Sequence, residues 1–401
     1  MAQPETIRLL HITTVPMSLR FLRGQVGYMQ ARGFTVDALS SPGALLHQFA
    51  AEEGTGAHAV EMPRRISPLR DLIAVWRIVQ VIRQVRPHIV HAHTPKGGLL
   101  GMIAAWLARV PVRVYHMRGL PFVTASGYRR RLLVATERIA CRLAQRVICI
   151  GPSLRDEAVR ARLCPPDRLV VLCGGGNGTD AESLFNPARV SDSRVAIRQR
   201  LDIPAQAVVI GFVGRLVRDK GVIELAEAWS VVREVVPDAH LLIIGEPEPR
   251  DPVPEAILSQ LQADDRVHMV GFVADLTDMP PHYTAMDMLV LPTYREGFPN
   301  VPLEAAAMGL PVVATRVTGC VDAVLDGVTG TLVPVGDSGA LARAIRAYLD
   351  DPALRQQHGA AGRERVLRDF QPKAIWQALY AHYVDLLAQA GIPVNGDGPV
   401  A

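Results

Sequence analysis

The stretch VVIGFVGRLVRDKGVIELAEAWSVVREV, at residues 208–235, contains one complete strand–loop–helix unit and decides the class of fold. Its first six residues are apolar and mostly β-branched, as is typical of a strand in a parallel sheet. A glycine-flanked loop follows, and from residue 222 onward the apolar residues recur at helical spacing. Repetition of such a unit along a chain predicts a parallel sheet that is covered by helices.

Units of this kind recur from end to end. The strands that we expect are Ile7–Thr13, Thr35–Ser40, His88–His93, Val112–His116, Val147–Ile150, Leu169–Cys173, Val208–Val213, His240–Ile244, Val267–Phe272, Met288–Leu291 and Pro311–Ala314. The helices that we expect are Leu19–Ala31, Leu69–Val85, Leu99–Ala108, Arg129–Ala144, Val222–Val235, Pro254–Gln262, Val301–Met308 and a helical tail over Leu341–Ala390. This alternation predicts an α/β protein of two doubly wound, Rossmann-like domains.

The length of 401 residues also favours two domains. A glycine-dense run at residues 174–180 interrupts the alternation and is a candidate hinge. We expect an N-terminal domain over residues 1–187, a second domain over 188–372, a helix near 373–390 that packs back on the first, and a frayed tail over 391–401. Because open α/β sheets bind ligands beyond the carboxyl ends of their strands, we expect the two sheets to face across a cleft.

The net charge of +4 conceals an uneven distribution. Residues 1–190 hold 25 Lys and Arg against 12 Asp and Glu, whereas residues 191–401 hold 18 against 27. The basic half is expected to face something anionic: nucleic acid, a phospholipid surface or a phosphorylated substrate. Scattered arginines with few interleaved aromatic residues are a poor match for nucleic-acid binding.

Segments that target or span a membrane are not expected. The start of the chain does not resemble a signal peptide, and the longest apolar window, Gly97–Ala108, is much shorter than the ~20 residues of a spanning helix. The five cysteines form no C-x-x-C pair, which favours buried free thiols over disulfides or structural zinc. We therefore expect a cytoplasmic protein that touches the inner face of the cytoplasmic membrane without crossing it.

Two motifs in the second half carry chemistry. Arg215 and Lys220 lie in a glycine-flanked loop before a helix, where backbone N–H groups and the helix dipole would help two cations to bind a diphosphate. The alternative is an ordinary helical turn with two solvated cations. Glu296 follows a strand and Glu304 lies in the next helix, so both carboxylates can reach one pocket and accept sugar hydroxyls. The alternative places Glu296 at the helix dipole and Glu304 on a solvated face.

These motifs, together with Gly271–Val273, Gly309–Thr315 and Gly327–Gly330, closely resemble those of retaining glycosyltransferases of family 4, which have the two-domain GT-B fold. In the first half, residues 40–43, 91–98 and 118–122 are similar to a narrower group that makes bacterial capsular polysaccharides, exopolysaccharides and lipid-linked oligosaccharides. The resemblance covers nearly the whole chain.

The resemblance implies a role for each motif residue. Arg215 and Lys220 would hold the donor diphosphate, Glu304 the ribose, and Glu296 would lie beside the donor sugar. The remaining residues of the expected donor site are Gly214, Gly297, Phe298, Pro299 and Asn300. Fixed cations stabilise the negative charge that develops on the leaving phosphate, and no D-x-D motif occurs nearby, so we expect no metal and no cofactor.

Histidines follow two strands of the first domain. Relatives carry His-Gly where this chain has Arg118-Gly119, and His116 lies two residues earlier on the same face of the strand, so either side chain would take the role of the family histidine. A core histidine is the alternative for His116. His91 and His93 form a conceivable metal pair, but no third ligand is apparent nearby.

The acceptor side is expected in the same domain. His93 and Lys96 follow a strand, and Lys96 would meet an acceptor phosphate or form a plain helical turn. Arg129 and Arg130 begin a helix beside aromatic residues, and arginines are interleaved with apolar residues in Leu69–Val85. Each of these helices presents either a solvated face or a surface that rests on anionic lipid.

The resemblance implies a retaining, metal-independent transfer of sugar from UDP-GlcNAc, UDP-GalNAc or a related UDP-sugar to a lipid-linked, polyprenyl-diphosphate saccharide. A UDP-sugar 2-epimerase and a non-catalytic binding subunit of the same fold are the alternatives. A dehydrogenase is disfavoured because no G-x-G-x-x-G follows the first strand, and a glycosidase would not need the Arg215/Lys220 anion site.

Overall fold

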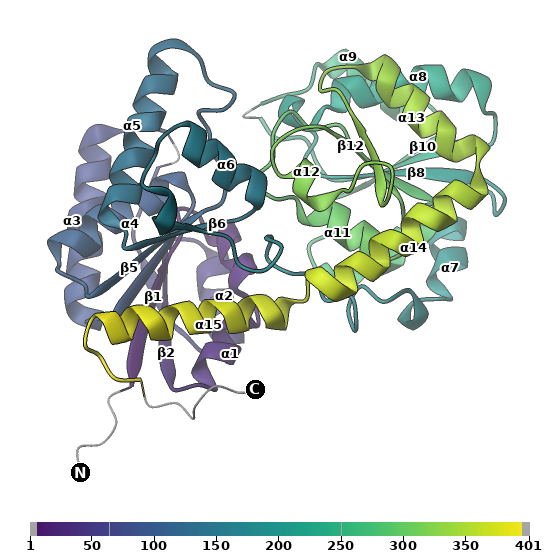
Figure 1. The fold of residues 1–401 in the computed structure, drawn as a ribbon. Coiled ribbons are helices and arrows are strands. Elements are labelled where there is room, and N and C mark those ends of the chain that lie inside the picture. Colours follow the sequence, from purple (N-terminus) through teal and green to yellow (C-terminus); the bar gives the residue numbers. More distant parts are fainter. Residues whose placement is uncertain (1–5, 64, 250, 395–401) are drawn as a thin grey trace. The chain divides into compact units, whose positions relative to one another are not determined.

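The computed structural model describes residues 6–63, 65–249 and 251–394 (Figure 1). The chain divides into two compact units. Unit 1 comprises residues 1–175 and 373–401, and unit 2 comprises residues 176–372. The described cysteines are all free, and Cys173 is exposed instead of buried. No helix among the described residues combines the length and apolarity needed to cross a bilayer.

Unit 1 is built on a seven-stranded parallel sheet with strand order β3-β2-β1-β4-β5-β6-β7. Its strands are β1 (Ile7–Ile12), β2 (Phe34–Ser40), β3 (Gly56–Ala59), β4 (Ile89–His93), β5 (Val112–Met117), β6 (Arg146–Cys149) and β7 (Leu169–Val170). The chain builds outward in one direction from β1 to β3 and then in the other from β4, so β1 and β4 meet where the winding reverses. Ligands of open α/β sheets bind beyond the strand ends at such a reversal.

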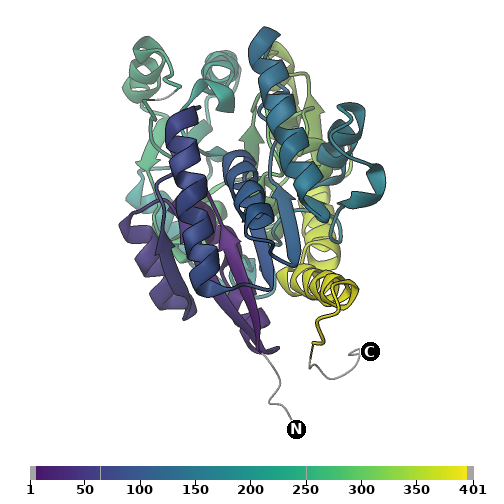
Figure 2. The same cartoon turned by 90° about the vertical axis from the view of Figure 1, so that its left-hand side faces the viewer.

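Helices cover both faces of this sheet. On one face, α3 (Pro68–Val85), α4 (Pro95–Leu107) and α5 (Gly127–Leu143) pack side by side (Figure 2). On the other, α1 (Gln25–Gln30), α2 (Ala44–Glu53) and α15 (Pro372–Gln389) contribute to one apolar core with alternate strand residues such as Leu9 and Val114. A short 3₁₀ helix (Pro16–Leu22), α6 (Pro152–Arg160) and a second 3₁₀ turn (Pro166–Arg168) complete the unit.

Unit 2 repeats the design with six parallel strands in the order β10-β9-β8-β11-β12-β13. These are β8 (Val208–Val213), β9 (Ala239–Ile244), β10 (Val267–Gly271), β11 (Met288–Leu291), β12 (Val312–Thr315) and β13 (Gly330–Val333). Here the winding reverses between β8 and β11, which pair through Met288 and Leu289. The loops after these two strands are therefore expected to carry the binding residues.

The helices of unit 2 follow the same plan. They are α7 (Ser193–Arg200), α8 (Val222–Val235), α9 (Glu255–Ala263), α10 (Met279–Ala285), α11 (Asn300–Ala307), α12 (Cys320–Ala323), α13 (Ser338–Asp350) and α14 (Pro352–Asp369), with 3₁₀ turns at Pro187–Arg189, Arg218–Lys220 and Leu276–Asp278. Trp229 of α8 and Tyr348 of α13 are fully or almost fully buried against the strands. Burial of such large side chains supplies much of the stabilisation of an α/β layer.

The predicted doubly wound fold is confirmed, with local differences. The edge strands β3 and β13 were not expected, because each has only four residues and no strongly apolar pattern. The helix predicted at Leu19–Ala31 is broken, since Gly24 takes φ +72° between the 3₁₀ helix and α1. Helix α7 is not among the expected helices, and it is held by ion pairs from Arg194 and Arg198 to Asp287.

The units divide at Gly175, ahead of the boundary expected at residue 187. Residues after this point pack within unit 2: the Thr179 N–H donates to the Phe370 carbonyl at 2.8 Å, and the Phe185 ring lies 6.0 Å from that of Tyr283. The segment expected to be a frayed tail is partly ordered, because Ile392 and Val394 pack against the core of unit 1. Residues 395–401 of that segment lie outside the described residues.

Helix α5 contains a buried acid. Glu137 is 3% exposed, and its carboxylate accepts a hydrogen bond of 2.8 Å from the Tyr115 hydroxyl of β5. Burial raises the pKa of Glu137 to about 7, against an ordinary value of 4.5, although the Tyr115 hydrogen bond opposes the shift. Between these two values the folded protein binds a proton that the unfolded chain does not bind.

Because the folded pKa is raised, Glu137 should stabilise the fold fully below about pH 4.5 and lose this contribution as the pH rises through about 7. The unfolding free energy of the wild type relative to Glu137→Gln should fall by about 3 kcal/mol across this interval, as urea titrations at several pH values would measure. Exposed Glu61 provides the control, and a Glu61→Gln variant that shows the same fall would contradict the assignment.

Candidate active site

The loops after β8 and β11 bring the two sequence motifs of unit 2 together. Lys220 precedes α8, Glu296 lies in the loop before α11, and the Lys220 ammonium forms an ion pair with the Glu296 carboxylate. Both side chains are mostly buried, with 20% and 14% of their surfaces exposed. Cys320, at the start of α12, is buried near Glu296. Its burial, with the Glu296 charge as a further cause, raises the pKa of its thiol well above the ordinary value.

Arg215 lies in the same loop as Lys220 but points to another acid. Its guanidinium pairs with Glu248, and 59% of the Arg215 side chain is exposed. The two cations therefore lie in one loop, as the motif predicts, and each of them has a carboxylate partner. Glu248 was not identified from the sequence, because it follows β9 and no motif marks it.

Glu304 occupies the second turn of α11, as expected. Its Oε2 accepts a hydrogen bond of 2.7 Å from the hydroxyl of Tyr283, which is fully buried on α10. Burial, with the Glu304 charge as a further cause, raises the pKa of this hydroxyl well above 10.0, so Tyr283 stays a donor. Glu304 is half-buried, and its carboxylate retains further acceptor positions for hydroxyl groups.

The residues between the two acids are held by their neighbours. Pro299 precedes α11, the Phe298 ring lies 5.8 Å from that of Phe370, and the Asn300 side chain accepts a hydrogen bond of 3.3 Å from Asn177. A Cβ atom on Gly319 would lie 2.6 Å from the Gly297 carbonyl oxygen. Only glycine allows this loop and α12 to approach so closely.

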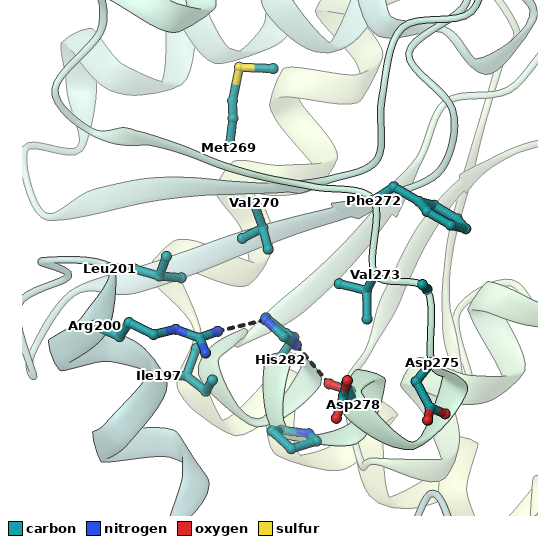
Figure 3. Close-up of a pocket in the computed structure, with 12 residues that line it drawn as sticks. Ile197, Arg200, Leu201, Met269, Val270, Phe272, Val273, Asp275, Asp278 and His282 are labelled. Carbon is teal, nitrogen blue, oxygen red and sulfur yellow. Dashed lines mark hydrogen bonds between the residues drawn. The ribbon is translucent and has the colours of Figure 1, made fainter.

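A separate pocket of about 810 Å³ lies near the carboxyl end of β10 in unit 2. Figure 3 shows the Arg200 guanidinium directed at His282, with 2.9 Å between Arg200 Nη2 and His282 Nε2. Phe272 and Val273 line the same pocket. None of the motif residues Arg215, Lys220, Glu296 and Glu304 is among its lining residues, so the pocket and the two motifs are distinct features.

The candidate residues of unit 1 gather at the reversal between β1 and β4. His93 and His116 are buried register partners on β4 and β5, and Arg118 Nε donates to His93 Nδ1 at 3.3 Å. The Arg118 guanidinium also lies over the Phe21 ring, 4.8 Å from its centroid. Burial lowers the pKa of Arg118 to about 9 and that of His116 well below 6.5.

The structure adds members to this group that sequence reasoning missed. His11 of β1 contacts His93 and lies 3.5 Å from Gln25, and the Tyr383 hydroxyl of α15 reaches His91 Nδ1 at 2.5 Å. A histidine inside the apolar first strand was an available signal for His11. Tyr383 belongs to an aromatic stretch of the last helix. Its contact with His91 could not be predicted, because it depends on how this helix packs on the sheet of unit 1.

The other residues expected on the acceptor side lie at the starts of helices. Lys96 forms an ion pair of 2.7 Å with Asp71 of α3 and donates to the Arg65 carbonyl. Arg129 and Arg130 are exposed in the first turn of α5, and the Arg130 guanidinium lies 5.7 Å from the Phe122 ring centroid. Lys96 therefore joins the starts of α3 and α4, whereas the two arginines face solvent.

Two protein-family models match the chain, one in each half. Residues 207–351 match the model described as "Glycosyl transferases group 1", and residues 19–175 match the "Glycosyl transferase 4-like domain".

Among curated proteins, the capsular polysaccharide biosynthesis glycosyltransferase CapM of Staphylococcus aureus is 32% identical over 384 residues, covering 96% of this chain and 98% of CapM. An Escherichia coli enzyme named UDP-Gal:α-D-GlcNAc-diphosphoundecaprenol α-1,3-galactosyltransferase is 27% identical, covering 73% of this chain and 74% of its own.

Solved structures share the fold. A sucrose-phosphate synthase of Thermosynechococcus elongatus superposes with a TM-score of 0.77 at 23% identity, covering 96% of this chain and all of its own. The Anabaena protein HepE, solved with UDP and glucose, gives a TM-score of 0.75 at 20% identity, covering 94% of this chain and 99% of its own. These two structural neighbours are evidence for the fold.

The position of Lys220 depends on the next residue. Gly221 has φ +70°, and a Cβ atom there would lie 2.0 Å from the Pro292 carbonyl oxygen. Gly221→Ala should therefore destabilise unit 2 by more than ~2 kcal/mol, as thermal unfolding would measure, because strain and a backbone clash add. Gly327 has φ +71° with open space around it, so Gly327→Ala measures the strain alone. Equal losses in the two variants would contradict the clash.

Proposed function

We propose a transfer reaction for this chain, which belongs to the group 1, family 4-like glycosyltransferases. The chain transfers a sugar from a UDP-sugar to a hydroxyl of a lipid-linked saccharide in bacterial capsule or lipopolysaccharide assembly. The observation that carries this proposal is the Lys220–Glu296 pair at the reversal between β8 and β11. Cation and acid meet there at the starts of α8 and α11, where helix N-termini favour an anion.

In this proposal the donor diphosphate binds to the cations of the β8 loop. Lys220 and Arg215 exchange their carboxylate partners, Glu296 and Glu248, for phosphate oxygens. Breakage of the bond between anomeric carbon and phosphate leaves negative charge on the diphosphate, and the two cations stabilise that charge. Because protein cations supply this stabilisation, the transfer step should need no metal.

The two acids take different parts. Glu304, oriented by Tyr283, accepts hydrogen bonds from the ribose hydroxyls. Glu296, released from Lys220, lies beside the donor sugar with the backbone from Gly297 to Asn300. The proposed reaction retains the anomeric configuration, as the family resemblance implies. The same resemblance implies that His116 or Arg118 takes the role of the family histidine.

The acceptor is proposed to reach unit 1 from an anionic membrane surface. Crossover helices begin at the carboxyl edge of a parallel sheet, so the first turns of α3 and α5 lie at that edge. On α3, Leu69, Leu72, Ile73 and Trp76 are between 51% and 80% exposed, and exposed arginines lie among them. On α5, Tyr128 is 80% exposed beside Arg129 and Arg130. Exposed apolar side chains rimmed by arginines are typical of an interfacial helix.

The donor site is tested by variants assayed for UDP release from UDP-GlcNAc or UDP-GalNAc with a polyprenyl-diphosphate saccharide. Lys220→Ala, Arg215→Ala and Glu296→Ala should each lower kcat by ~100-fold or more, whereas Glu304→Gln should mainly raise the KM for the donor. EDTA should leave the rate of the wild type unchanged.

Arg218 is the matched control, since it lies in the same loop but donates to the Pro252 carbonyl at 3.0 Å. Arg218→Ala should retain the wild-type rate. Wild-type activity in Glu296→Ala, or conversion of UDP-GlcNAc without any acceptor as NMR would detect, would refute the proposed transfer reaction.

The membrane surface is tested separately by co-sedimentation with vesicles. The wild type should bind vesicles that contain phosphatidylglycerol, and added salt should weaken binding, because each basic residue near the surface contributes ~1 kcal/mol. Leu72→Ser combined with Trp76→Ser should abolish most of the binding. Trp106 is 54% exposed but lies near the C-terminal end of α4, away from the carboxyl edge of the sheet. Trp106→Ser should therefore bind like the wild type. Binding without dependence on anionic lipid would contradict the proposed surface.

A further inference from the structure

Four histidines from three neighbouring strands lie on one face of the sheet of unit 1. The register pairs His11 of β1 with His91 of β4, and His93 of β4 with His116 of β5. Neighbouring ring centroids are 4.1 to 5.4 Å apart. The exposed fractions are 1%, 0%, 1% and 8%, so the group is almost completely shielded from water. We call these four residues the histidine cluster.

Three members of the histidine cluster are arranged as metal ligands. One nitrogen from each of His11, His91 and His93 lies within 4.8 Å of the others. His11 Nδ1 and His93 Nε2 share a hydrogen bond of 2.9 Å, which a metal ion would replace. Zinc–nitrogen bonds of ~2.0–2.1 Å place two ligands of a tetrahedral site slightly more than 3 Å apart, so small rotations of the rings would suffice.

Several nitrogens of the histidine cluster make no hydrogen bond within the described part of the chain. His91 Nε2 and both ring nitrogens of His116 are buried and have no hydrogen-bond partner there. A buried polar atom that lacks a partner costs ~1–3 kcal/mol. Coordination of a metal ion by a lone pair would remove this cost.

The outer nitrogens of two rings already have the partners that orient metal ligands. His91 Nδ1 meets the Tyr383 hydroxyl at 2.5 Å, which turns Nε2 toward the other histidines. His11 Nε2 lies 3.5 Å from Gln25 Nε2, which leaves His11 Nδ1 on the inner side. With the Gln25 amide turned over, its oxygen would accept from His11 Nε2–H. Contacts of this kind fix the tautomer and the ring orientation of a ligating histidine.

The charge state also suits a metal. Burial disfavours the protonated forms of His11, His91 and His93 and lowers their pKa values, so each neutral ring has one nitrogen lone pair. Arg118 opposes a cation, because its Nε–H donates to His93 Nδ1 at 3.3 Å. Coordination through His93 Nε2 requires this contact to open, so that the ring proton moves to Nδ1. A strongly bonding transition metal can offset this repulsion, whereas Mg²⁺ or Ca²⁺, which prefer oxygen ligands, cannot.

From this geometry we infer that the histidine cluster binds one divalent transition-metal ion of the zinc type through His11 Nδ1, His91 Nε2 and His93 Nε2, with His116 available as a fourth ligand. The donor-binding residues belong to unit 2, whereas the histidine cluster belongs to unit 1 and includes His116, a candidate for the role of the family histidine. Occupancy of the metal site is not required for the proposed transfer, which uses protein cations at the diphosphate.

The untagged, full-length protein is titrated with Co²⁺, followed by visible absorption, and with Zn²⁺ in competition with a chelating dye. The wild type should bind one equivalent and show the spectrum of nitrogen-coordinated Co²⁺. His11→Gln and His91→Gln should each weaken binding by ~100-fold or more, and Tyr383→Phe by ~10-fold, since it removes only an orienting contact.

Matched controls come from the same chain. His240 and His268 form another histidine pair at 2.9 Å, with no third ligand among the residues that the structure describes. Tyr380 lies on the same helix as Tyr383. His240→Gln and Tyr380→Phe should bind metal like the wild type. Histidine ring ¹⁵N shifts of the wild type on addition of Zn²⁺ provide a readout that needs no variant.

No binding by the wild type, no shift of three or more ring nitrogens, or undiminished binding by His11→Gln and His91→Gln would each overturn the inference. Because neither donor nor acceptor is present in these measurements, their failure would leave the proposed transfer reaction unaffected.

Discussion

The constraint on which the rest of the structure depends is the parallel pairing of the strands. Each parallel strand must be followed by a crossover, so every loop that leaves a carboxyl end emerges on the same edge of the sheet. Where the winding reverses, two such loops diverge and leave space for a ligand. Both units have one reversal, between β1 and β4 and between β8 and β11, and both groups of candidate residues lie there.

In unit 2 this constraint brings together residues that are distant in sequence. Lys220 and Glu296 are 76 positions apart and form an ion pair because β8 and β11 are adjacent strands. Glycines make the approach possible, since Gly221 packs against Pro292 and Gly319 against Gly297. The same ion pair keeps both side chains partly buried, so a bound diphosphate would exchange one charged partner for another instead of stripping water from an isolated cation.

In unit 1 the corresponding edge contains a group of buried imidazoles next to Arg118, besides the Lys96–Asp71 ion pair. Burial of four histidines on one face of the sheet is tolerated because desolvation keeps them unprotonated. Helix α15 completes the environment by placing Tyr383 on His91, although 292 positions separate the two residues. The last helix of the chain therefore contributes directly to the part of unit 1 where ligands are expected to bind.

The sequence by itself determined the fold class, most strand positions and the identity of the charged motif residues. The bounds predicted from the apolar patterns are those observed for Val208–Val213, Met288–Leu291 and Val222–Val235, because local burial and propensity agree there. Short edge strands such as β3 and β13 could not be recognised, since their pairing comes from neighbours and not from their own composition.

Only the tertiary structure decided which side chains act together. It paired Arg215 with Glu248, oriented Glu304 through Tyr283 and supplied His11 as the third member of a group in which the sequence shows only His91 and His93. The physical reason is that strand register and the packing of the last helix on unit 1 bring residues from distant segments into contact. Neither of them leaves a local pattern in the sequence.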